Sequence, residues 1–355
     1  MLGDFDIEAG VDPLLDWFMN HARILPWRTD AAPYRVWISE IMLQQTRVEA
    51  VKPYFERFVK ELPDILSLAL CPEDKLLKLW EGLGYYNRAR NLKSAAQQIM
   101  EQYNGEMPSD YEELLKLKGI GHYTAGAIAS IAYGKRTPAV DGNVLRVITR
   151  LTGDSTDIMR QSFRNKVEEA IGAVMPDGRC GAFNQALMEL GAIVCVPNGE
   201  PECSKCPWET ICTAHKEGSE VEYPIKKKPK ERRIEEKTIL VIRDGEKVVL
   251  QKRPAKGLLA GMYEFPAKDG HLTKEEALEI SKKMGFLPLR IRCLPEAKHV
   301  FSHVEWHMSA YLINVSELAD APKGLLLAER TQVERDFAVP AAYGTYMRAI
   351  HFAEN

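Results

Sequence analysis

The sequence predicts two domains, a helical one over residues 1–223 and an α+β one over residues 237–355, joined by a linker at 224–236. Three observations support this division. Apolar residues recur at helical spacing through much of the first part. A stretch rich in proline and charge follows at Pro224–Glu236. Beyond it, Thr238–Ile242 and Lys247–Gln251 read as strands around Asp244-Gly245, a hairpin turn signal.

The composition is that of a globular protein. Of 355 residues, 45% are hydrophobic and 27% charged, and this length can bury a sizeable core. The longest apolar stretch, Tyr123–Tyr133, is too short to cross a bilayer, and the acidic start Met1–Asp6 lacks signal-peptide features. We therefore expect a monomeric cytoplasmic protein that does not bind a membrane. The net charge of −3 means that any nucleic-acid-binding face must be local. The basic run Lys226–Lys230 is read as a solvated linker rather than a phosphate contact.

A tight turn with two glycines lies between two predicted helices. The first helix covers Tyr111–Lys116 and the second covers Thr124–Ala132, with Lys118, Gly119 and Gly121 in the turn. Bare glycine backbone at a helix N-terminus lets several N–H groups face one phosphate. The alternative is an ordinary helical turn with glycine at the C-cap.

Glu40 is a single carboxylate in an apolar stretch. Val36–Thr46 is helical in composition, and Pro33 stands near its N-terminal position. Burial raises the pKa of a carboxylic acid, and an acid that stays protonated near neutral pH can donate a proton. The alternative is that Glu40 pairs with an arginine or caps a helix.

Asp141 precedes a third predicted helix, which starts at Gly142-Asn143. This position makes Asp141 an N-cap, where the helix dipole favours the anion. A purely capping role is the alternative. Together, Glu40 and Asp141 offer an acid for a leaving group and an anion for a cationic sugar, the pair that glycosidic cleavage requires.

Four cysteines form a compact pattern, C-x7-C-x2-C-x5-C, in a loop broken by proline and glycine. Four thiolates this close suit one tetrahedral centre, and either zinc or an iron–sulfur cluster fits them. The four residues are Cys195, Cys203, Cys206 and Cys212. The three other cysteines are expected to be unliganded, partly buried thiols: Cys71, Cys180 and Cys293.

Several segments in this order resemble the MutY family of adenine DNA glycosylases, in the helix-hairpin-helix (endonuclease III-like) superfamily. The hairpin, Asp141–Asn143 and the cysteine loop take part, together with Leu25–Arg28, Trp37–Thr46, Trp80–Tyr86 and Ala182–Gln185. The resemblance implies a base-excision-repair enzyme that removes adenine opposite 8-oxoguanine or guanine in double-stranded DNA, in the cytoplasm at the nucleoid. It also implies a six-helix barrel at about 28–134 and an iron–sulfur module built from the N-terminus and 135–223. The family carries a 4Fe–4S cluster with one residue fewer in the first cysteine loop.

The resemblance assigns roles to individual positions. Glu40 would protonate adenine, and Asp141 would stabilise the sugar cation with support from Tyr123 and Asn143. The remaining assignments are Arg28 and Gln185 in the adenine pocket, and Gln45, Thr46, Leu83, Tyr85, Lys118, Gly119 and Gly121 on DNA. Leu83 and Tyr85 could instead be core residues, and Gln45 a surface residue.

Position 123 predicts the reaction type. Relatives that also cut the strand have a lysine there, whose amine attacks the sugar as a Schiff-base nucleophile. Tyr123 has no amine, so the sequence predicts base excision without strong strand cleavage. Two alternative functions remain: an endonuclease III-like glycosylase/lyase for oxidised pyrimidines, and a non-catalytic iron–sulfur DNA-binding protein.

The C-terminal domain resembles a Nudix (MutT-like) domain, with an amphipathic helix at about Lys274–Met284. Lys282 and Lys283 stand where a Nudix hydrolase holds divalent metal with glutamates, so pyrophosphatase activity is not expected. The domain is predicted to recognise 8-oxoguanine through Phe301, Ser302 and His303. The alternative for these three is a strand end with alternating burial.

Overall fold

The computed structural model describes residues 7–226, 231–245, 247–318 and 320–350. The chain divides into two compact units, and each is described by itself. The first contains residues 1–71 and 90–228, and the second contains residues 72–89 and 229–355. Residues 72–89 fall in the predicted helical domain, and the predicted domain boundaries stay a prediction. Residues 227–230 of the predicted linker and basic run lie outside the described residues.

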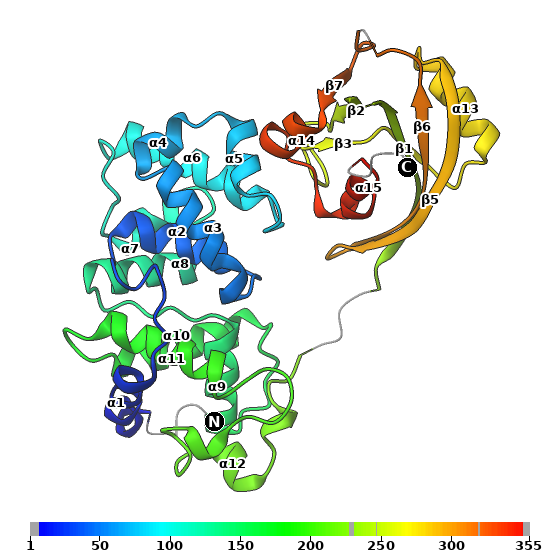
Figure 1. The fold of residues 1–355 in the computed structure, drawn as a ribbon. Coiled ribbons are helices and arrows are strands. Elements are labelled where there is room, and N and C mark those ends of the chain that lie inside the picture. Colours follow the sequence, from blue (N-terminus) through cyan, green and yellow to red (C-terminus); the bar gives the residue numbers. More distant parts are fainter. Residues whose placement is uncertain (1–6, 227–230, 246, 319, 351–355) are drawn as a thin grey trace. The chain divides into compact units, whose positions relative to one another are not determined.

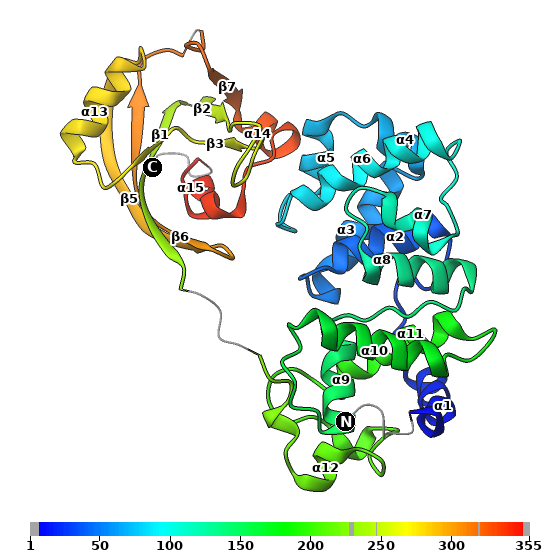
Figure 2. The ribbon, with the colours of Figure 1, turned by 180° about the vertical axis from the view of Figure 1, so that it is seen from behind.

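The first unit is helical throughout its described residues (Figures 1 and 2). Among the described residues, no helix combines the length and apolar character needed to span a bilayer. The helices are α1 (Val11–His21), α2 (Pro33–Leu43), α3 (Val48–Glu61), α4 (Ile65–Leu70), α6 (Asn87–Gln102, which begins in the second unit), α7 (Tyr111–Lys116), α8 (His122–Ala127), α9 (Gly142–Thr152), α10 (Gln161–Val174), α11 (Cys180–Ile193) and α12 (Thr213–Glu217).

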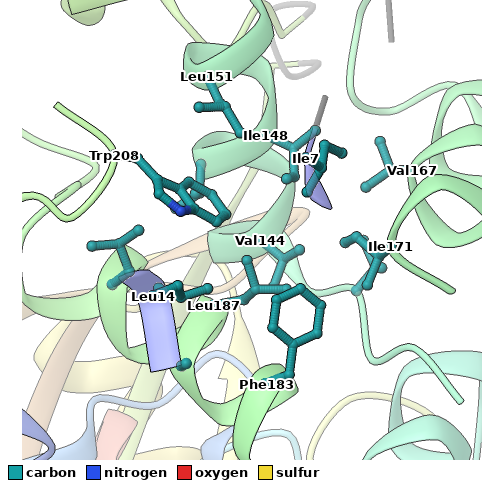
Figure 3. Close-up of a cluster of buried hydrophobic side chains, with 14 of the residues drawn as sticks. Ile7, Leu14, Val144, Ile148, Leu151, Val167, Ile171, Phe183, Leu187 and Trp208 are labelled. Atoms are coloured by element: carbon teal, nitrogen blue, oxygen red, sulfur yellow. The ribbon is translucent and has the colours of Figure 1, made fainter. Parts of the chain in front are cut away.

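A buried cluster fixes the helix that follows Asp141. Figure 3 shows Leu14 of α1, Val144 of α9 and Phe183 of α11 packed together with Trp208 of the cysteine loop. The Trp208 indole N–H also donates to the carbonyl oxygen of Gly10, at 2.8 Å. Apolar burial of this kind contributes roughly 25 cal/mol per Å². The same core therefore holds α9 and the cysteine loop in place.

The local helix predictions are confirmed, with two ends misplaced. Helix α7 has the predicted bounds Tyr111–Lys116. Helix α8 begins at His122 rather than Thr124 and continues through a π-helical turn, Ile128–Ala132. Helix α2 begins at Pro33, which occupies its first turn, but it ends at Leu43 rather than Thr46. Gln45 has φ of 59°, a left-handed conformation that cannot continue a right-handed helix.

The second unit is built on a mixed seven-stranded sheet with the order β3-β2-β1-β6-β5. Strand β4 pairs with β1 and β7 with β2. The β1–β2 hairpin is antiparallel, whereas β1 and β6 run parallel. The predicted hairpin around Asp244-Gly245 is thus confirmed. The strands are β1 (Arg233–Asp244), β2 (Lys247–Lys252), β3 (Tyr263–Glu264), β4 (Ala267–Asp269), β5 (Pro288–Val300), β6 (Val304–Val315) and β7 (Leu325–Glu329).

Helices pack on both faces of this sheet (Figure 1). Alternate residues of β1 point to opposite faces, as the pleat requires. Ile239 lies in one buried cluster with Tyr346 of α15, and Leu240 lies in another with Ala277 of α13. The predicted amphipathic helix is confirmed as α13. The helices of this unit are α5 (Glu73–Leu79), α13 (Lys274–Lys283), α14 (Arg330–Asp336) and α15 (Gly344–Ala349).

Polar contacts hold α5 within the second unit. Lys78 Nζ donates to the carbonyl oxygens of Val333 and Phe337, at 3.2 and 3.0 Å, where the C-terminal turn of α14 has free carbonyls. Asp74 accepts from Lys252 Nζ at 2.6 Å and from the Tyr263 hydroxyl at 3.1 Å. These contacts account for the grouping of 72–89 with the C-terminal residues.

Candidate active site

A cavity of about 780 Å³ opens in the first unit, and eight of the predicted site residues line it. They come from the turn before α2, from α2 and the turn after it, from α8, from the start of α9 and from α11. The eight are Arg28, Glu40, Gln45, Thr46, Tyr123, Asp141, Asn143 and Gln185. The fold therefore brings Glu40, Asp141 and most of the residues predicted to act with them into one cavity.

Glu40 is the buried acid of this cavity, with only 6% of its surface exposed. Burial raises the pKa of Glu40 to about 7, while a hydrogen bond from the Tyr123 hydroxyl to Oε2 works in the opposite direction. The nearby charge of Asp141 adds to the rise. Tyr123 donates to Glu40 rather than to Asp141, which differs from the role implied by the resemblance. A carboxyl with this pKa holds its proton in a large fraction of molecules at neutral pH.

Asp141 caps α9, as the sequence predicts. Its Oδ1 accepts from the backbone N–H groups of Asn143 and Val144 at 2.9 and 2.8 Å, and its Oδ2 accepts from Asn143 Nδ2 at 2.7 Å. The expectation that the surroundings of Asp141 lower its pKa and favour the anion is wrong. Burial raises the pKa of Asp141, and the bonds from Val144 and Asn143 only oppose that rise. The cap geometry is local, whereas the burial comes from packing that the sequence does not reveal.

A hydrogen-bond chain leads from Asp141 to the cysteine loop. Asn143 Oδ1 accepts from Arg146 Nη2 at 2.9 Å, and Arg146 Nε donates to the carbonyl oxygen of Cys195 at 2.8 Å. Arg146 Nη2 also donates to the carbonyl oxygen of Gly191 at 2.6 Å. Because Arg146 is buried, its guanidinium fixes the distance between the start of α9 and the first cysteine.

Arg23 and Glu189 are cavity residues that the sequence analysis missed. Glu189 of α11 accepts from Arg23 Nε at 2.7 Å and from Arg28 Nη2 at 2.8 Å. Although burial opposes the shift, these hydrogen bonds lower the pKa of Glu189 to about 2. The carboxylate holds Arg28 against the cavity. A signal existed: like Glu40, Glu189 is the lone carboxylate of an apolar helix.

Glu189→Gln is expected to lower stability most at neutral pH. The depressed pKa means that Glu189 stabilises the fold above its unfolded pKa of about 4.3 and loses that contribution as the pH falls toward 2. Losing the charge leaves the half-buried Arg23 and Arg28 without their shared carboxylate, a cost of about 2 kcal/mol because solvent screens part of the arginine charge. Urea unfolding at pH 7 and pH 3 measures the effect, with the exposed Glu169→Gln as the control. An equal loss at both pH values would contradict this assignment.

The four predicted metal-binding cysteines line one small cavity of about 30 Å³. Arg150 lines it too, and its Nη1 donates to Cys195 Sγ at 3.3 Å, which suits an anionic thiolate. Another set of possible ligands overlaps it, since Cys203, His215 and Glu220 bring ligand atoms within 4.8 Å of one another. The donor set is therefore compatible with a metal centre. Four cysteines surround one cavity, and this donor set suits either zinc or an iron–sulfur cluster.

The three other cysteines differ in burial. Cys71 and Cys180 are buried, as expected for inert thiols. Cys293 is exposed, so the expectation of partial burial is wrong for it. It lies on β5, and strand periodicity alone did not indicate which face would be covered.

The glycine turn has the shape of a hairpin between α7 and α8. Gly119 has φ of 81°, and a Cβ there would lie 2.6 Å from Cβ of Asn91, so only glycine fits. Gly121 is extended, with open space where a Cβ would stand. Lys118 is exposed, and its backbone N–H donates to Gln98 Oε1 at 2.8 Å. The turn thus presents backbone and one cation to solvent.

Two of the predicted DNA-contacting residues have an uncommon backbone conformation. Gln45 and Tyr85 have φ of 59° and 46°, a region that costs a non-glycine residue of order 1 kcal/mol. Such strain is typical of functional positions.

The two predicted DNA-contacting residues of the second unit differ in exposure. Leu83 is buried, whereas half of the Tyr85 surface is exposed.

The predicted 8-oxoguanine-reading residues form the turn between β5 and β6. Ser302 and His303 are exposed, and the Ser302 hydroxyl lies 3.0 Å from the Tyr85 hydroxyl. Phe301 packs edge-on against Trp306, with ring centroids 4.9 Å apart. The segment therefore has an anchored aromatic residue followed by two exposed polar ones.

Comparison with known proteins defines the class of this site. Residues 38–172 match the model of the HhH-GPD superfamily of base excision DNA repair proteins, and residues 238–349 match the NUDIX domain. Among solved structures, the chain resembles a thermostable thymine-DNA glycosylase at 29% identity (TM-score 0.54; 59% of this chain and 96% of that one). It also resembles endonuclease III in a trapped covalent complex with DNA at 25% identity (TM-score 0.52; 60% and 96%). The protein is a helix-hairpin-helix DNA repair glycosylase with a C-terminal Nudix domain, so the predicted fold class is confirmed.

Curated relatives narrow the class. The adenine DNA glycosylase of Buchnera aphidicola from Schizaphis graminum is 35% identical over 305 residues, covering 85% of this chain and 87% of the relative. The Homo sapiens enzyme is 34% identical over 366 residues, covering 86% and 67%. The chain belongs to the adenine DNA glycosylase family, whose members hydrolyse N-glycosyl bonds in base excision repair.

Proposed function

We propose that this enzyme removes adenine mispaired with 8-oxoguanine, or with guanine, from double-stranded DNA and leaves the strand uncut. It would act as a monomer on the nucleoid in the cytoplasm. One observation carries the proposal: a buried carboxyl with a pKa of about 7 and the aspartate that caps α9 line the same cavity. An N-glycosidic bond breaks when the departing base takes a proton and the sugar cation is stabilised.

Each carboxyl has a distinct part in that reaction. Glu40 delivers its proton to N7 of the flipped adenine, and Tyr123 holds its carboxyl in the reactive orientation. Asp141 stabilises the developing positive charge on the sugar. Arg28 and Gln185 orient the adenine, and both line the cavity beside Glu40. Flipping is required because the bond is inaccessible inside a duplex.

Tyr123 supports a reaction that stops at base removal. A strand-cutting glycosylase needs an amine that attacks the sugar. The phenol of Tyr123 has no amine, and its pKa is raised well above 10 by burial, so it is not a nucleophile at neutral pH. Lys118 is exposed in the hairpin, where it would bind a phosphate beside the N–H groups of Gly119 and Gly121.

One assay tests the function. A labelled duplex with adenine opposite 8-oxoguanine, and a matched one with adenine opposite guanine, are incubated with the enzyme and divided. Strand breaks are expected only after hot alkali, with faster excision opposite 8-oxoguanine. Efficient incision without alkali would favour the endonuclease III-like alternative. Binding without adenine release would favour a non-catalytic protein.

The Nudix domain is proposed to read the base opposite the adenine. Ser302 and His303 would hydrogen-bond its edge and Phe301 would pack in the groove, while Gln45, Thr46 and Tyr85 enter the stack. The burial of Leu83 favours its alternative role as a core residue. A pyrophosphatase role is not expected, since Lys282 pairs with Glu279 at 2.8 Å and neutralises that carboxylate. Cationic groups at this place repel divalent metal.

We further propose that Cys195, Cys203, Cys206 and Cys212 hold a 4Fe–4S cluster. When bound, the cluster would crosslink the loop and keep its backbone in place on DNA. The four-thiol cavity and the donor from Arg150 to Cys195 Sγ support this choice. Analysis of the purified protein should find about four iron and four acid-labile sulfide. One zinc with no sulfide would instead indicate a zinc site.

A further inference from the structure

The cavity contains more cationic groups than its own carboxylates neutralise. Arg23 and Arg28 are both paired with Glu189. Arg47 and Arg164 also line the cavity, and neither forms an ion pair with any carboxylate in the part of the chain that the structure describes. The two arginines come from separate elements, the N-cap of α3 and the first turn of α10.

Arg164 is fixed in place before any ligand binds. Its Nε donates to the carbonyl oxygen of Ile158 at 3.1 Å, and the side chain is half-buried. This contact uses one of the five donors of a guanidinium and leaves the two terminal nitrogens for a ligand. The planar fork matches two oxygens of one phosphate, and holding the fork in place reduces the entropy lost on binding. Arg47 is exposed beside Gln45 and Thr46 at the same cavity.

The occupant that fits this pair is an anion on the DNA strand. A nucleotide that enters the cavity brings its flanking phosphates near the two carboxyls, Glu40 and Asp141. Glu40 is neutral when it acts as the proton donor, but the negative charge of Asp141 opposes the phosphates. Two uncompensated arginines beside these carboxyls offset that repulsion. A base edge is a weaker partner for these arginines than a phosphate, because a phosphate carries a full negative charge and a base does not.

We propose that Arg164 and Arg47 bind the phosphates that flank the flipped adenosine, and so hold its sugar beside Asp141. This assignment rests on the proposed function, because it takes the nucleotide in the cavity to be adenosine. It is a positioning role that carries no sequence information. It is separate from the backbone contacts proposed for the glycine hairpin.

The salt dependence of DNA binding tests the assignment. Full-length Glu40→Gln protein keeps the substrate intact, and its dissociation constant for an adenine:8-oxoguanine duplex is measured at several salt concentrations. Each phosphate contact contributes about 0.9 to the slope of log K against log salt. Arg164→Ala and Arg47→Ala should each reduce the slope by about 0.9, and the double variant by about 1.8. Arg164→Gln keeps a donor for Ile158 and should behave like Arg164→Ala, which excludes misfolding as the cause.

An uncharged phosphate analogue shows which phosphate each arginine contacts. Methylphosphonate is placed singly at the phosphates on either side of the adenine. When methylphosphonate replaces the phosphate that an arginine binds, the Glu40→Gln parent should lose about fivefold to tenfold in affinity at 0.1 M salt. The variant that already lacks that arginine should lose no more affinity at that position. Arg160→Ala, on the residue preceding α10 and away from the cavity lining, is the matched charge control and should leave the slope unchanged.

Two results would overturn the proposal. One is a slope of log K against log salt that is the same in both arginine variants as in the Glu40→Gln parent. The other is a methylphosphonate penalty equal in the variants and in the parent at every flanking position. Adenine release by the wild-type chain is measured separately on the same duplex, so a failure of the proposed substrate would not be mistaken for a failure of the phosphate contacts.

Discussion

Glu40→Gln is expected to abolish adenine release while DNA binding is kept. The amide has nearly the same shape as the carboxyl, and its oxygen still accepts the hydrogen bond from Tyr123, but it has no acidic proton to transfer to the base. A positioned general acid typically contributes 10²–10⁴-fold, so a loss of roughly this size in the single-turnover rate is expected. Release of free adenine under single-turnover conditions measures it.

The control for this change lies in the same unit. Glu168→Gln removes a carboxylate from α10 that does not line the cavity, and it should leave the rate unchanged. A Glu40→Gln enzyme that retains half of its activity would show that another group protonates the base. Loss of both release and binding would indicate a structural role for Glu40.

The second large effect is expected for Asp141→Asn. Asparagine caps a helix about as well as aspartate, so α9 should keep its start and the thermal midpoint should change little. The sugar cation, however, loses its anionic partner. Removing one preorganised electrostatic group typically costs 10²–10³-fold in rate, and this is the loss expected here.

Asp110→Asn separates capping from catalysis. Asp110 caps α7 as Asp141 caps α9, with Oδ1 accepting from the N–H groups of Glu112 and Glu113 at 3.0 and 3.1 Å. It lines no part of the cavity. Both variants should melt like the wild type, and only Asp141→Asn should lose activity. If both substitutions changed the excision rate equally and only slightly, the role of Asp141 would be limited to capping α9.

Local chemistry explains which parts of the fold were predictable. The bounds of α7 and the capped start of α9 follow from a few neighbouring residues, so the sequence alone located them. The end of α2 depends on the left-handed conformation of Gln45, which no propensity indicates. Likewise, the sequence did not foresee Cys293 as exposed, because strand periodicity does not show which face of β5 is covered or that β5 ends the strand order, paired with β6.

The site shows the same division. Sequence reasoning found Glu40 because a lone carboxylate in an apolar helix has to be buried. The same reasoning applies to Glu189, which was missed because its two arginine partners lie more than 160 residues away in sequence. The pKa of Asp141 was predicted in the wrong direction, since the capping bonds are local and the burial is not.

The pH dependence of adenine excision tests the central claim most directly. Glu40 must be protonated to act, and burial raises its pKa to about 7. The single-turnover rate on an adenine:8-oxoguanine duplex should therefore fall as the pH rises above about 7, approaching tenfold per pH unit. A rate that stays constant from pH 6 to pH 9 would contradict the assignment of Glu40 as the proton donor.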